Sequence, residues 1–144
     1  MIQRIQSVWL FLAALVMALL FYFPTYKFNI ATPTTPSTLS IGEDFLAIIM
    51  VALSIVLSLV TIFKYKNRKH QISLTWLNIL VCIGLQVWLV IRVNSKTTEA
   101  AYASLQGHYW IGLFIPLVTI ILLFMAKAGI SKDQKLIKSL DRLR

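Results

Sequence analysis

Polar side chains recur at helical spacing within two apolar stretches that are long enough to cross a membrane. In the third apolar stretch of the sequence, successive polar residues lie three or four positions apart, namely Thr75, Asn78, Cys82 and Gln86. The second stretch carries a matching set of small or polar residues, Ala47, Ser54, Ser58 and Thr61. These intervals place each set on one face of a helix. The chemistry that these side chains offer is hydrogen bonding, to a neighbouring helix or to a ligand.

Two interpretations of this polar face are open. The two stretches are joined by only eight residues, Lys64 to Gln71, so they form an antiparallel hairpin whose small and polar faces meet and bond to each other. Alternatively, Asn78 and Gln86 contact a lipid, a quinone or a partner helix. Each amide would cost several kcal/mol if it faced hydrocarbon without a partner, so neither should face lipid. We favour the first interpretation.

The apolar stretches lack the groups that catalysis or ion transport requires. None contains Asp, Glu, Lys, Arg or His, which argues against a coupled transporter because proton relays and ion sites use such residues. The two histidines, His70 and His108, are predicted on opposite sides of the membrane and so cannot form a haem or metal pair. The single cysteine excludes a disulfide framework. No activated nucleophile can be drawn, so we expect no catalytic residue, cofactor, metal site or enzymatic activity.

Four membrane-crossing helices are the elements that must position these residues. The chain has 144 residues and is 58% hydrophobic but only 13% charged, about half the charged fraction of an ordinary soluble domain. About 20 residues of helix cross the hydrocarbon layer. Including their interfacial flanks, the suitable stretches are 5–26, 45–63, 72–91 and 109–126. The predicted fold is all-α and polytopic, with a four-helix transmembrane domain over 1–128 and a cytoplasmic tail over 129–144.

The distribution of Lys and Arg orients these helices. Eleven of the 14 lie on one predicted side, in the N-terminal flank, in the connection between the second and third helices, and in the tail. Only Lys27, Arg92 and Lys96 lie on the other side. Because cytoplasmic loops carry the excess of basic residues, both termini are expected in the cytoplasm.

The two outer connections are predicted to differ in structure. The first, 27–44, contains a Thr- and Pro-rich segment at 31–38 without apolar periodicity, and we expect it to be irregular or locally extended. The second has Thr98 and Glu99 before a run of helix-forming residues that Gly107 ends. This pattern predicts a short surface helix over 100–106.

The tail has the pattern of a short amphipathic helix. Ser131 and Gln134 match a capping box, which predicts that a helix begins there. One face carries Leu136, Ile137, Leu140 and Leu143, and the other carries Lys132, Lys135, Lys138 and Arg142. Such a helix lies on the anionic lipid of the inner leaflet or docks in a groove of a protein partner. Nucleic acid is not expected as a partner, because no aromatic stacking platform accompanies the basic residues.

Three segments carry a resemblance to a known family. They are Met-Ile-Gln-Arg-Ile-Gln at 1–6, Lys-Asn-Arg-Lys at 66–69 followed by Gln71 and Ile72, and Lys-Leu-Ile-Lys-Ser-Leu-Asp-Arg-Leu-Arg at 135–144. In these segments the chain resembles a family of small integral membrane proteins from Bacteroidota, which is defined as a domain of unknown function. The resemblance covers nearly the whole chain. It implies a four-helix protein of the bacterial inner membrane without an established activity.

All three segments fall on the predicted cytoplasmic side, and we expect them to form one contact surface together with the basic tail. The residues assigned to this surface are Arg4, Asn67, Arg68, Gln71, Lys132, Lys135, Lys138, Asp141, Arg142 and Arg144. The expected function is structural or regulatory, exerted through this surface on a protein partner or on anionic lipid. The alternative function is a carrier or binder of an uncharged hydrophobic molecule, which would use Asn78 and Gln86.

Overall fold

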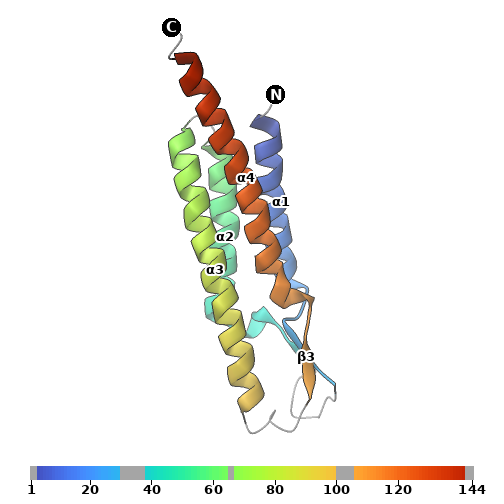
Figure 1. The fold of residues 1–144 in the computed structure, drawn as a ribbon. Coiled ribbons are helices and arrows are strands. Elements are labelled where there is room, and N and C mark those ends of the chain that lie inside the picture. Colours follow the sequence, from blue (N-terminus) through green and yellow to red (C-terminus); the bar gives the residue numbers. More distant parts are fainter. Residues whose placement is uncertain (1–2, 30–37, 65–66, 100–105, 142–144) are drawn as a thin grey trace.

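The described part of the chain folds into four helices that lie side by side, with a small sheet at one end (Figure 1). The computed structural model describes the backbone of residues 3–29, 38–64, 67–99 and 106–141, and the side chains of these residues except 3, 4, 138, 140 and 141. The helices are α1 (Gln3–Ala18), which the 3-10 turn η1 (Leu19–Phe21) continues, α2 (Phe45–Phe63), α3 (Arg68–Thr98) and α4 (Ile111–Asp141).

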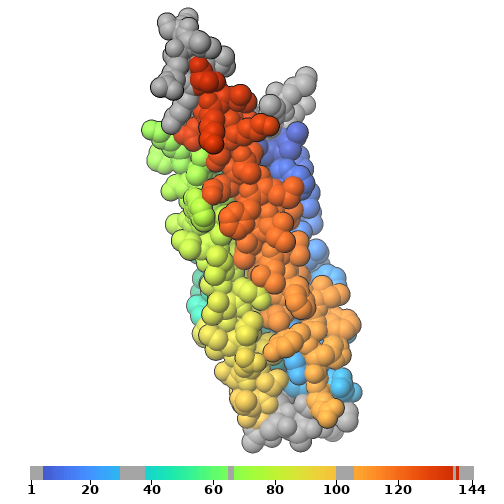
Figure 2. Space-filling view, in the orientation of Figure 1, coloured from blue at the N-terminus to red at the C-terminus, as the bar shows by residue number. Residues whose placement is uncertain are grey.

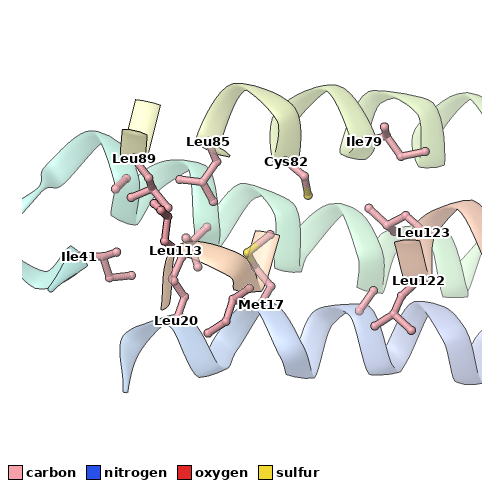
Figure 3. Close-up of a cluster of buried hydrophobic side chains, with 14 of the residues drawn as sticks. Met17, Leu20, Ile41, Ile79, Cys82, Leu85, Leu89, Leu113, Leu122 and Leu123 are labelled. Atoms are coloured by element: carbon pink, nitrogen blue, oxygen red, sulfur yellow. The ribbon is translucent and has the colours of Figure 1, made fainter. Parts of the chain in front are cut away.

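The helices form a bundle with one shared interior. α1 packs against α2 and α4, and α3 packs against the same two helices. The core gathers Met17 from α1, Leu20 from η1, Leu85 and Leu89 from α3, and Leu113 from α4 (Figure 3). Each of these side chains comes from the inward face of its helix, as expected when apolar residues recur every three or four positions.

The outer surface of the bundle is also apolar. Phe45 and Phe63, at the two ends of α2, are each 78% exposed, and Leu80 on α3 is 65% exposed. Three helical segments are long and apolar enough to cross a membrane, Phe45–Phe63, Arg68–Thr98 and Ile111–Ile137. A fourth and shorter apolar segment is Ile5–Phe21. Large apolar side chains on the outside of long helices indicate a membrane protein, because hydrocarbon and not water covers such a surface.

A three-stranded sheet closes one end of the bundle, a feature that the all-α prediction did not include. The central strand β1 (Tyr26–Phe28) pairs antiparallel with β2 (Thr38–Leu39) on one side and with β3 (Gly107–Tyr109) on the other. Beneath the sheet, Tyr26, Phe28 and Leu39 form a second buried cluster with Val93 of α3. The sheet therefore joins the segment after α1, the segment before α2 and the segment before α4 at this end of the bundle.

The first helical segment is shorter than predicted because the chain turns into this sheet. The helical backbone ends at Phe21, whereas the sequence predicted a span to Tyr26. Pro24 accounts for the difference, because proline disfavours helical backbone at the residue before it and cannot donate a helical hydrogen bond. The first outer connection is extended in β1 and β2 and forms a short turn, η2 (Ile41–Glu43). Residues 30–37 lie outside the described part of the chain.

The C-terminal tail does not form a separate helix. α4 runs without interruption from Ile111 to Asp141, so the helix start predicted at Ser131 is wrong. The physical reason is a contact between helices, since Gln6 of α1 donates a hydrogen bond to Asp133, which the capping pattern had placed in a new first turn. Ile130 is fully buried just before this contact. The short helix predicted over 100–106 falls on residues 100–105, which lie outside the described part.

Candidate functional site

The polar faces of α2 and α3 meet inside the bundle. Asn78 Nδ2 donates to the backbone oxygen of Ser54 at 3.2 Å and to the hydroxyl of Ser58 at 2.8 Å. The hydroxyl of Ser54 lies 3.4 Å from the sulfur of Cys82. All four side chains are completely buried. We call these four residues the polar seam; its hydrogen bonds join α2 to α3 in the buried interior of the bundle.

Two further polar residues of α3, which lie nearer its first residue than the polar seam does, also have hydrogen-bond partners. Thr75 donates to the backbone oxygen of Gln71 at 2.8 Å, within its own helix. Gln71 donates to the backbone oxygen of Thr61 at 3.0 Å and is buried. The prediction that Gln71 belongs to the cytoplasmic contact surface is therefore wrong, because its amide is used to hold α3 against α2.

The structure does not bring Gln86 into the polar seam, although it lies one helical turn beyond Cys82. Its side chain is half-buried, and its amide oxygen is buried without a hydrogen-bond partner among the described residues. Of the polar face predicted from spacing, Thr75, Asn78 and Cys82 are thus hydrogen-bonded, whereas the amide oxygen of Gln86 has no partner among the described residues. Within the described residues no group of His, Cys, Asp and Glu is arranged to hold a metal ion. The chemistry that the structure shows in the polar seam is hydrogen bonding.

A charged cluster at the sheet end of the bundle was missed by sequence reasoning. Asp44 precedes α2 and accepts hydrogen bonds from the backbone nitrogens of Leu46 and Ala47. The same carboxylate accepts from Trp88 Nε1 at 2.7 Å and lies 3.2 Å from Arg92 Nη1. We call Asp44, Trp88 and Arg92 the outer clasp. Its signal in the sequence was an Asp directly before an apolar stretch, which is a helix N-cap pattern.

Basic side chains gather at the opposite end, from which α4 projects. This basic end comprises Lys64, Arg68, Lys69, Lys127, Lys132 and Lys135. Lys127 is half-buried and its ammonium lies 3.8 Å from the ring centroid of Trp76. Both ion pairs found among the described residues, Arg92 with Asp44 and Lys96 with Glu99, lie at the sheet end. The positive charge of the basic end is therefore presented outward and is not neutralised by ion pairs within the described structure.

The other residues predicted for the contact surface have different outcomes. Asn67, Lys132 and Lys135 are exposed and Arg68 is half-buried, all at the basic end. The backbone positions of Arg4, Lys138 and Asp141 belong to α1 and α4, but their side chains lie outside the described part. Arg142 and Arg144 lie outside it altogether. The structure thus places the connection between α2 and α3 and the part of α4 around Lys132 and Lys135 at the same end of the bundle.

Close contact between α1 and α4 fixes the helix that carries the basic end. Besides the bond from Gln6 to Asp133, the side chain of Gln6 lies against Gly129, where an added Cβ would be 2.9 Å from Gln6 Cγ. At the other end, Gly112 donates from its backbone nitrogen to the oxygen of Pro24 at 3.0 Å. A Cβ on Gly112 would overlap the oxygens of Phe23 and Pro24. Glycine is therefore required at 112 for α4 to approach the chain that follows η1.

Comparison with known proteins identifies a family but no activity. No curated protein and no solved structure matches the chain. A family described as a domain of unknown function, DUF4293, matches residues 2–143. This match confirms the resemblance found in the sequence to a family of unknown function. The chain belongs to the DUF4293 family.

Proposed function

We propose that the chain is an accessory or regulatory component of a bacterial inner membrane that acts through its basic end on a protein partner or on anionic lipid. The observation that carries this proposal is the contrast between the two ends of the bundle. Arg92, Lys96 and Lys27 at the sheet end are each held by an internal partner. The exposed lysines of the basic end point outward, where they attract negative charge.

The proposal includes four membrane crossings, and the contacts of α1 support the fourth. α1 with η1 is shorter than the other apolar helices, but the segment from Gln6 to Pro24 contacts both ends of the same stretch of α4. Gln6 lies against Gly129, and Pro24 accepts from Gly112. These two glycines are separated by about 26 Å along a helix. A segment that reaches from one end of this stretch to the other crosses the same layer as α4.

The orientation follows from the same charges. If the bundle crosses the membrane four times, α1 begins and α4 ends on one side, which is also the side of the basic end. Basic residues are retained on the cytoplasmic side. Both termini and the basic end are therefore cytoplasmic in this proposal, and the three-stranded sheet lies outside.

The proposal is tested by removing charge at one end only. The basic-end variant replaces Lys64, Lys69, Lys132 and Lys135 by Gln, and the control variant replaces Lys27 and Lys96 by Gln. Both proteins are extracted from native membranes in mild detergent, and the mass of the assembly and its content of anionic lipid are measured. We expect the basic-end variant alone to lose protein partner or anionic lipid. Identical assemblies in the two variants and the unchanged chain would contradict the proposal.

A second candidate function has one observation in its favour. The unpartnered amide oxygen of Gln86 could accept a hydrogen bond from an uncharged hydrophobic molecule that carries a hydroxyl or amine. Asn78, which the sequence had paired with Gln86 in this function, already donates twice within the polar seam. A binder of this kind would lose a co-purifying apolar molecule in Gln86→Leu and retain it when the basic end is neutralised.

A further inference from the structure

The C-terminal part of α4 stands clear of the other helices. Figure 1 shows its end beyond the ends of α1, α2 and α3, and Figure 2 shows the same segment projecting from the body of the bundle. Ile130 is fully buried, and Asp133 is held by Gln6. Since α4 is one continuous helix, the residues after Asp133 continue along the direction of the bundle.

This projecting segment carries two large apolar side chains that are about half exposed. Leu136 is 48% exposed and Ile137 is 43% exposed. Lys132 and Lys135, one turn or less away, are exposed as well. Apolar residues are expected on the lipid-facing sides of the bundle, but here they lie beyond it.

The depth of this segment decides whether lipid can cover it. Lys127 stacks on Trp76, and both residue types belong at the level of the lipid headgroups. Leu136 follows Lys127 by nine residues, which is about 13 Å along a helix. The headgroup layer on each side of a membrane is only about 5 to 8 Å thick. A helix that covers its apolar face with lipid lies in the plane of the interface, whereas α4 continues out of the bundle. With Lys127 and Trp76 placed at the headgroups, Leu136 and Ile137 lie beyond the headgroup layer.

The positive charge of this segment decides between the two remaining kinds of occupant, a second copy of the chain and a different protein. A second copy of the chain would bring the same lysines to the contact and would be repelled. A groove with an apolar floor and acidic side chains on its rim matches both features of the segment.

We propose that residues 132–137 dock into an apolar, acidic-rimmed groove of a cytoplasmic protein, with Leu136 and Ile137 inserted in the groove and Lys132 and Lys135 against its rim. This inference rests on the proposed function and chooses a protein over lipid as the occupant of this segment. The mode is that of an amphipathic helix that lays its apolar face in a groove.

The test measures how fast a water-soluble maleimide alkylates a cysteine placed at Leu136. The Leu136→Cys chain is studied in open fragments of its native membranes, and after purification in vesicles of phosphatidylethanolamine and phosphatidylglycerol. His70→Cys, an exposed position at the same end that belongs neither to the basic end nor to the projecting segment, is the matched control, and the unchanged chain with buried Cys82 gives the background. We expect Leu136→Cys to react about tenfold more slowly in native membranes than in vesicles, as for a site occupied nine-tenths of the time, with no such change for His70→Cys.

Charge reversal completes the test. Adding Lys132→Glu and Lys135→Glu should restore the fast reaction of Leu136→Cys in native membranes. Equal rates in native membranes and vesicles would overturn the inference. Slow reaction of Leu136→Cys in the vesicles would also overturn the inference. Lipid is then the occupant if the slow reaction requires phosphatidylglycerol, and a second copy of the chain is the occupant if the reaction becomes slower as the protein density in the vesicles rises. If Leu136→Cys stays reactive while the basic-end variant still loses its partner or lipid, the proposed function survives and only this inference fails.

Discussion

Arg92 Nη1 lies 3.2 Å from Asp44 Oδ2, and this pair joins the outer ends of α2 and α3. The two side chains are only 16% and 10% exposed, so the ion pair is largely shielded from water. Asp44 also caps α2 through two backbone nitrogens and accepts from the Trp88 indole. One carboxylate thus satisfies a helix end, an indole and a guanidinium.

Asp44→Ala should strongly destabilise the bundle. It removes the cap, leaves the indole without its acceptor and leaves a shielded guanidinium without its carboxylate partner, so the free energy of unfolding in detergent should fall by about 3 kcal/mol. The exposed pair of Lys96 with Glu99 provides the control, and Glu99→Ala should cost less than about 1 kcal/mol. Equal losses in the two variants would show that the outer clasp does not hold the helices.

The position of this pair follows from the register that the polar seam sets. Ser54 lies opposite Cys82, and ten residues farther out on each helix lie Asp44 and Arg92. The sequence was sufficient to predict the two polar faces and the hairpin that brings them together. It was not sufficient to predict the outer clasp, because helical spacing assigns residues to faces but leaves the relative shift of two helices open until one contact is known.

Contacts between distant segments explain the remaining differences. The capping box at Ser131 and Gln134 is a local pattern, but it is overridden by the bond from Gln6 to Asp133, which are 127 positions apart. The sheet depends on β1 and β3, which the sequence separates by two whole helices. Strands of two or three residues are too short to show the alternating pattern by which strands are recognised.

Asn78 and Gln86 should differ in their contribution to stability. Asn78→Ala removes the two hydrogen bonds that Asn78 donates in the polar seam and the weak one that it accepts from Cys82, and should lower the free energy of unfolding by about 1 to 2 kcal/mol. Gln86→Ala removes an amide whose oxygen has no partner among the described residues, and it should cost less than about 0.5 kcal/mol. Thermal unfolding in detergent, followed by tryptophan fluorescence, compares the two. A larger loss for Gln86→Ala would mean that the amide is bonded in the folded protein.

Gly112 and Gly84 make a matched pair within the helices. Gly112→Ala forces a methyl group onto the backbone oxygens of Phe23 and Pro24, so α4 must move away from the chain after α1, at a cost of about 1 to 3 kcal/mol. Gly84→Ala meets only the flexible end of Met50 at 3.1 Å and gains helix propensity, worth up to about 1 kcal/mol. The midpoints of chemical unfolding should therefore shift in opposite directions. A stabilising Gly112→Ala would contradict the close approach.

The bond between Gln6 and Asp133 should appear as a coupling between the two ends of the chain. Gln6→Leu leaves a carboxylate that is only 6% exposed without its donor, and should cost about 1 to 3 kcal/mol. The double variant with Asp133→Leu should recover most of this loss, because both polar partners are then gone. A double-mutant cycle measures the coupling. Strict additivity of the two single losses would exclude a direct bond.

The sidedness of the bundle is the claim on which the functional account depends, and cysteine labelling in spheroplasts tests it most directly. His108 is exposed at the sheet end and Lys69 at the basic end. A maleimide that cannot cross membranes should label His108→Cys in intact spheroplasts, and should label Lys69→Cys only after the membrane is opened. Labelling of Lys69→Cys in intact spheroplasts would place the basic end outside and would contradict a cytoplasmic site of action.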